Sequence, residues 1–282
     1  MPSDLYPVCR TVEMVKIAKG VASVARKEWF SLCGRAAVVI GGTSGLGRAI
    51  ALGLAEQGAD VVASGRSDEK VWETGREIEE AGSRTIFRAV NVNGRESIDS
   101  LRDAVLAEFG RADILVNAAG LTGRVPTAQV NEGTWNSLID TNLNGVLRAC
   151  QSFYPALKAS GHGRIINVAS LGSFLAFYQV AGYCASKAAV LSLTRSLGCE
   201  WAADGICVNA IAPGVFPTEL NDELLEGTER GREILTRTPM HRFGRPEELV
   251  GAAILLASDA ASFLTGQCIA VDGGYLASGV NS

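Results

Sequence analysis

This sequence contains very little histidine and no closely spaced pair of cysteines of the C-x-x-C type. The 282 residues include two histidines, His162 and His241, so histidine metal sites and Ser-His-Asp hydrolysis are hard to build. The seven cysteines are scattered and form no C-x-x-C pair, which disfavours a disulfide framework and a cysteine zinc site. We therefore expect a cytoplasmic protein without a metal ion.

Long apolar runs and an excess of positive charge are also missing. No run approaches the ~18 apolar residues that a membrane span requires. The net charge of −4 argues against a general nucleic-acid or anionic-membrane surface. Hydrophobic residues nevertheless make up 47% of the chain, so it can bury a large core. We expect a globular protein with neither a nucleic-acid nor a membrane partner.

The first 28 residues differ from the rest of the chain. Residues 12–27 mix apolar side chains with lysine and arginine, a pattern that predicts an amphipathic helix. Charged residues interrupt this stretch, which excludes the apolar region of a secretory signal. We expect residues 1–28 to be a helical N-terminal extension and residues 29–282 to form one domain.

Short apolar runs alternate with stretches of helical periodicity from Ala36 onward. Apolar runs that do not alternate are typical of parallel strands buried on both faces. The order predicts an α/β fold with a doubly wound, seven-stranded parallel sheet of Rossmann type. The interruption at about 213–246 is too long for an ordinary connection and is expected to be a substrate lid. The expected strands are 36–40, 60–64, 85–90, 113–116, 164–168, 206–211 and 267–271, and the expected helices are 46–57, 67–81, 95–109, 133–158, 182–203 and 246–258.

A glycine-rich turn joins the first expected strand to the first helix. Gly41, Gly45 and Gly47 allow the backbone to turn tightly and to approach a pyrophosphate closely. The helix that follows offers free N–H groups and the positive end of its dipole. The spacing G-x-x-x-G-x-G is neither the commonest Rossmann pattern nor a P-loop. The turn alone also suits a plain strand-to-helix connection, but its position favours a dinucleotide site.

The second expected strand ends where a ribose selector is expected, and the sequence there reads Ser64-Gly65-Arg66. No acidic residue is present to bind a ribose 2′-hydroxyl. Arg66 can pair with a 2′-phosphate instead. This predicts a preference for NADP(H), with NAD(H) as the other cofactor, and a solvated surface arginine is the alternative interpretation of Arg66.

Ser170, Tyr183 and Lys187 form the central set of candidate catalytic residues. Tyr183 and Lys187 are four residues apart on an expected helix, so they share one face. A lysine ammonium beside a tyrosine is expected to lower the phenol pKa and to make it a general acid and base. Ser170 follows an expected strand, at the sheet edge where ligands bind.

Taken with the strand-end segment 117–120, Asn142 and Pro213-Gly214, these motifs resemble the short-chain dehydrogenase/reductase family over about residues 30–275. The resemblance implies that Tyr183 exchanges the substrate proton and that Ser170 holds the carbonyl oxygen. Lys187 would bind the nicotinamide ribose and Asn142 would support a proton-relay water. The cofactor-binding residues implied are Gly41, Thr43, Ser44, Gly45, Leu46, Gly47, Arg66, Asn91, Val92, Asn117, Ala118, Ala119, Gly120, Tyr183, Lys187, Pro213, Gly214, Val215 and Thr218.

Two positions depart from the family pattern. Ile40 precedes the first glycine, where the family usually has threonine. Asn91 follows the third expected strand, where the family often has the aspartate that meets the adenine amino group. The amide oxygen of Asn91 can still accept that hydrogen bond.

Within the family, the tracts 211–219, 237–246, 248–253 and 271–274 resemble sugar-acid dehydrogenases of the gluconate 5-dehydrogenase type, and less closely 3-oxoacyl-(acyl-carrier-protein) reductases. We expect interconversion of a carbonyl and a secondary alcohol on a sugar acid or polyol. The alternatives are an oxoacyl reductase and, more remotely, a non-catalytic nucleotide sensor. Arg124 is the candidate for a substrate carboxylate, with a solvated loop arginine as the alternative. The family also implies a homotetramer or homodimer.

Overall fold

In the computed structural model, six parallel strands form one sheet in the order β2-β1-β3-β4-β5-β6. The structure describes residues 28–218, 225 and 227–280, so the expected N-terminal extension lies outside the described residues apart from Glu28. The strands are β1 Ala36–Ile40, β2 Asp60–Ser64, β3 Ile114–Asn117, β4 Arg164–Val168, β5 Cys207–Pro213 and β6 Cys268–Val271. The helices are α1 Gly45–Glu56, α2 Asp68–Glu80, α3 Arg95–Phe109, α4 Glu132–Ile139, α5 Gly145–Ser160, α6 Ala181–Glu200, α7 Glu229–Arg237 and α8 Val250–Ala257.

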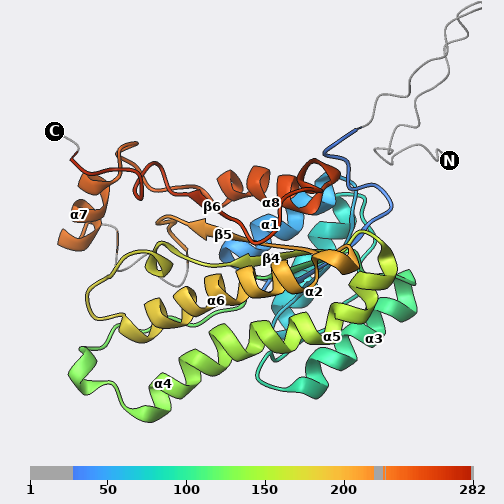
Figure 1. Cartoon of the computed structure of the whole chain (residues 1–282), viewed down its shortest axis with the longest axis horizontal. Helices are drawn as coiled ribbons and strands as arrows, with labels where there is room; N and C mark the ends of the chain where they lie inside the picture. Colours follow the sequence, from blue (N-terminus) through green and yellow to red (C-terminus); the bar gives the residue numbers. More distant parts are fainter. Residues whose placement is uncertain (1–27, 219–224, 226, 281–282) are drawn as a thin grey trace, which may run out of the picture.

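Helices cover both faces of the sheet, α1 and α8 on one side and α3, α5 and α6 on the other (Figure 1). Successive strand residues point to opposite faces, so Val39 packs with the first group of helices and Val38 with the second. All five residues of β1 are buried. Burial on both faces explains why the strands appear in the sequence as unbroken apolar runs, and it confirms the doubly wound α/β architecture.

The expected seventh strand, at 85–90, does not join the sheet. Two backbone hydrogen bonds connect this segment and β2 at their ends, from Val61 N to Arg84 O (3.0 Å), just before the segment, and from Val90 N to Gly65 O (2.8 Å), just after β2. Between them, the Ser64 hydroxyl donates to the carbonyl of Arg88, so a side chain replaces a backbone donor. The ladder is therefore interrupted, and β2 is one of the two edge strands of the sheet.

The expected helix at 133–158 is one helical run with a defect in its middle. Helices α4 and α5 are joined by a π-helical turn, Asp140–Asn144. Such turns are frequent at functional sites, and this one carries Asn142. Helix α7 lies within the stretch 213–246, which the sequence predicts to be a lid, and the sequence pattern does not predict this helix.

Among the described residues, no helix is long and apolar enough to cross a bilayer.

Candidate active site

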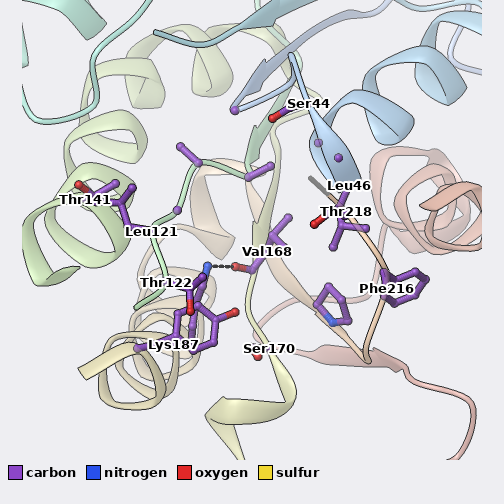
Figure 2. A pocket seen from close by; sticks show the side chains of 18 of the residues that line it. Ser44, Leu46, Leu121, Thr122, Thr141, Val168, Ser170, Lys187, Phe216 and Thr218 are labelled. Atoms are coloured by element: carbon purple, nitrogen blue, oxygen red, sulfur yellow. Dashed lines mark hydrogen bonds between the residues drawn. The ribbon is translucent and has the colours of Figure 1, made fainter. Parts of the chain in front are cut away.

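A cavity of about 730 Å³ opens where the carboxyl ends of β1 to β5 meet (Figure 2). This volume is typical of a small-molecule or cofactor site. Each strand is followed by a loop that contributes to the wall, because parallel strands end at the same edge of a sheet. These loops lie at 41–47, 65–67, 118–124, 169–171 and 214–218.

The glycine-rich turn forms a cradle in which larger residues would not fit. Gly41 has a φ of +83°, and a Cβ at this position would lie 2.4 Å from the backbone nitrogen of Ala119. A Cβ on Gly47 would lie 2.0 Å from the carbonyl oxygen of Gly41. Helix α1 begins here, and its N-cap residue Ser44 makes no side-chain capping bond. The N–H groups of the first turn are thus available to a phosphate, so the cradle fits a dinucleotide.

Basic residues gather at the end of the cavity beyond β2. Arg66 lines it as the sequence predicts, together with Ser67 and Lys70 from the start of α2. Ser67 caps α2 by accepting a hydrogen bond from Lys70 N (3.3 Å). Ser67 and Lys70 are not among the residues predicted from the sequence, although a capping serine at the start of a helix is a signal that could have indicated them.

All of the expected cofactor-binding residues line the cavity except Asn117. Asn117 is 3% exposed, and its side-chain amide donates to Asn167 Oδ1 (2.9 Å) inside the sheet. The side chain therefore links β3 to β4 and is not placed to contact a nucleotide. Asn91 does line the cavity, but its Oδ1 accepts a hydrogen bond from Asn93 N (3.1 Å). One lone pair of this oxygen is thus used within its own turn, and the second can still accept a hydrogen bond from an adenine amino group.

Ser170, Tyr183 and Lys187 come together on the cavity wall. Lys187 is 4% exposed, and its Nζ donates to the carbonyl of Val168 at 2.7 Å, the dashed line in Figure 2. Its Nζ lies 5.9 Å from the centroid of the Tyr183 ring. Ser170 accepts a hydrogen bond from Gly172 N (3.0 Å), which fixes its hydroxyl after β4. Tyr183 and Lys187 thus lie on one face of α6, as their spacing of four residues predicts.

The pKa of Tyr183 differs from the sequence expectation. Burial raises it above its usual value, and a hydrogen bond with Ser170 acts in the opposite direction. Lys187 is buried as well, and burial lowers its own pKa to about 8. Lys187 is not among the groups that shift the pKa of Tyr183, so the lowering expected from the ammonium is not found in this nucleotide-free site.

We expect Lys187→Met to make the nucleotide-free protein more stable at pH 7, even though activity is lost. The unfolded lysine has a pKa of ~10.4 and the folded one a pKa of about 8. The unfolded state therefore binds more protons between these values, and stability falls as the pH drops from 10 to 8, by up to about 3 kcal/mol. Thermal unfolding should show that the variant is more stable than the wild type at pH 7 and that this difference in stability decreases toward pH 10. A variant that is less stable at pH 7 would contradict this view of the site.

Asn142 is brought to the site but does not line the cavity. It is completely buried, and its Nδ2 donates to Leu121 O (2.9 Å) and to Ser186 Oγ (3.0 Å). Its Oδ1 accepts from Leu121 N (2.7 Å). Its side-chain amide therefore holds the loop after β3 against α6 and so positions the residues around Lys187.

Arg124 lines the cavity from the loop after β3, as the sequence predicts. Its Nε donates to Gln179 Oε1 (2.8 Å), and Gln179 O accepts from Val125 N (2.8 Å). Gln179 has a φ of +66°, unusual for a residue other than glycine. The guanidinium is thus oriented by a neighbour from the segment before α6.

Comparison with known proteins places this arrangement among nucleotide-dependent reductases and dehydrogenases. A family model described as enoyl-(acyl carrier protein) reductase matches residues 40–276. The 2-dehydro-3-deoxy-D-gluconate 5-dehydrogenase of Dickeya dadantii is 39% identical over 249 residues, 88% of this chain and 98% of that protein. A 3-oxoacyl-(acyl-carrier-protein) reductase of Thermotoga maritima is 36% identical over 244 residues, 86% of this chain and 98% of that protein. The crystal structure of a gluconate 5-dehydrogenase from Burkholderia cenocepacia with NADP and tartrate is 39% identical, with a TM-score of 0.84, over 89% of this chain and 98% of that one.

Proposed function

The chain belongs to the short-chain dehydrogenase/reductase family, and we propose that it oxidises or reduces a sugar acid or a related polyol with NADP(H). As a member of this family it is an NAD(P)-dependent oxidoreductase that interconverts a carbonyl and a secondary alcohol. The observation that carries the proposal is the meeting of Ser170, Tyr183 and Lys187 on the wall of the cavity that also contains the glycine cradle.

Each residue of this group has a task that its surroundings support. Tyr183 gives a proton to the carbonyl oxygen, or takes one from the alcohol, as general acid or base. Ser170 holds the same oxygen, and its bond from Gly172 N keeps the hydroxyl in place. Lys187 anchors the nicotinamide ribose and is itself oriented by the carbonyl of Val168. When bound, the nicotinamide supplies or accepts the hydride.

The cradle and the basic end of the cavity support NADP(H) as the cofactor. We expect Arg66→Ala to raise KM for NADP(H) about 10- to 100-fold, the scale of a lost hydrogen bond to a charged group. KM for NAD(H), which has no 2′-phosphate, should change by less than about twofold on the same argument. Arg76→Ala is the matched control, because Arg76 is on α2 but pairs with Glu79 and does not line the cavity. Equal effects on both cofactors would assign Arg66 another task.

The substrate class rests on two supports, the similarity to a sugar-acid dehydrogenase and the presence of Arg124 at the cavity. A guanidinium matches the two oxygens of a carboxylate. The second candidate is an oxoacyl thioester, which the similarity to an acyl-carrier-protein reductase and an apolar wall at Leu171 and Phe177 favour. A panel of sugar acids, polyols and acetoacetyl thioesters, followed by nicotinamide absorbance with both cofactors, separates the two. Turnover of the thioester alone would overturn the sugar-acid proposal.

A further inference from the structure

The described cavity wall carries five cationic side chains and no carboxylate. Arg66 and Lys70 lie at the end beyond β2, where a 2′-phosphate would bind. Lys187 belongs to the reacting group, and Arg124 is oriented by Gln179. The fifth cation, Arg230, comes from α7 and has no task in the function proposed above.

Helix α7 packs at the substrate end of the cavity. Its Ile234 forms a buried apolar cluster with Leu171, Leu225 and Tyr275, and Leu171 directly follows Ser170. The start of the helix is fixed, because Thr228 Oγ1 accepts a hydrogen bond from Gly231 N (2.9 Å). Arg230 is therefore held on an ordered turn next to the residues that would surround the substrate.

The first turn of α7 lies close to Leu225, which precedes the helix in the chain. A Cβ on Gly231 would lie 1.9 Å from the carbonyl oxygen of Leu225, so this position accepts only glycine. The tight contact sets the rotation of the first turn of α7. As a result the residue before Gly231, Arg230, contributes to the cavity wall.

Arg230 is half-buried, and in the part of the chain that the structure describes its side chain has no hydrogen bond or ion pair. Burial raises the pKa of Tyr275 above its usual value, and the charges of Arg237, Glu233 and Arg230 act on it as smaller contributions. Glu233 lies three residues further along the same helix, and neither it nor Arg230 has an ion pair among the described residues. Other arginines of the region are engaged, for example Arg242, which makes two bonds of 2.7 Å to Glu248. A guanidinium that is partly desolvated and unpaired is poised for an anion.

We propose that Arg230 binds the anionic group of the substrate, a carboxylate, as a second guanidinium beside the one on Arg124. The inference rests on the proposed function and extends it to a residue of α7. A guanidinium with five N–H donors, partly buried beside apolar side chains and with no carboxylate among the described residues of the cavity wall, binds a carboxylate more tightly than an exposed one does. Arg230 thus selects acids over neutral polyols of the same length.

The test compares D-gluconate with sorbitol, which has the same carbon chain without a carboxylate. Arg230→Gln should raise KM for gluconate about 10- to 100-fold. The Kd of gluconate for the enzyme–NADPH complex should rise by the same factor. The same variant should leave the KM and Kd of sorbitol unchanged, and also the Kd of NADPH. Arg230→Lys should recover only part of the loss, because an ammonium keeps the charge but not the two parallel N–H donors of the guanidinium. Arg232→Gln is the control, because Arg232 is exposed on the same helix and does not line the cavity.

The outcomes separate the two proposals. If the wild-type NADPH complex binds gluconate no better than sorbitol, the sugar-acid function fails and the assignment of Arg230 fails with it. If the wild type prefers gluconate and Arg230→Gln keeps that preference, only the assignment of Arg230 fails. A loss of NADPH affinity in Arg230→Gln would place the residue at the cofactor and would also overturn the inference.

Discussion

Tyr183→Phe should lower kcat by about 10²- to 10⁴-fold, the usual contribution of a general acid or base, while NADPH still binds. The substitution keeps the ring and its packing on α6 and removes only the hydroxyl that meets Ser170. Steady-state kinetics and a fluorescence titration of NADPH measure the two effects. Tyr178→Phe is the matched control, because Tyr178 is 74% exposed and does not line the cavity.

The pH dependence provides a second measurement on Tyr183. Burial raises its pKa, so alcohol oxidation, which needs the deprotonated phenol, should accelerate as the pH rises. Carbonyl reduction needs the protonated phenol, so its rate should fall as the pH rises. Both slopes should disappear in Tyr183→Phe. Near-normal turnover in that variant would remove Tyr183 from the mechanism.

Gly47→Ala should both weaken NADPH binding and destabilise the protein. The added Cβ would lie 2.0 Å from Gly41 O and 3.0 Å from Ala118 Cβ, so the cradle has to open. Overpacking of this kind typically costs about 1–3 kcal/mol, and a similar loss in binding raises Kd about 10- to 100-fold. Thermal unfolding with and without NADPH measures both quantities.

Gly251→Ala is the control for this substitution. Gly251 is also in a helix, α8, and a Cβ there would meet nothing within 4 Å. Alanine is the better helix former, so this variant should be as stable as the wild type or more stable by up to about 1 kcal/mol. If Gly47→Ala behaved like Gly251→Ala, the cradle would be looser than the structure shows.

Much of the fold was predictable because parallel strands and their helices leave local marks in a sequence. The helix expected at 95–109 has these bounds in the structure, where it is α3. The prediction of a strand at 85–90 was wrong for a reason that the local sequence does not show. The hydroxyl of Ser64 on β2 donates to the carbonyl of Arg88, which would otherwise accept a hydrogen bond within the sheet. Helix α7 was missed because it is short and its apolar residues are few.

The candidate site divides in the same way. The order of residues along the chain is sufficient to place Tyr183 and Lys187 on one helical face and the glycines after β1, because spacing alone controls both. Which side chains reach the cavity depends instead on contacts between distant segments. Asn117 bonds to Asn167, Asn142 holds Leu121, and Arg230 remains unpaired among the described residues on a wall without carboxylates. Burial and pairing set the pKa and the task of each group, and both arise only when the chain has packed.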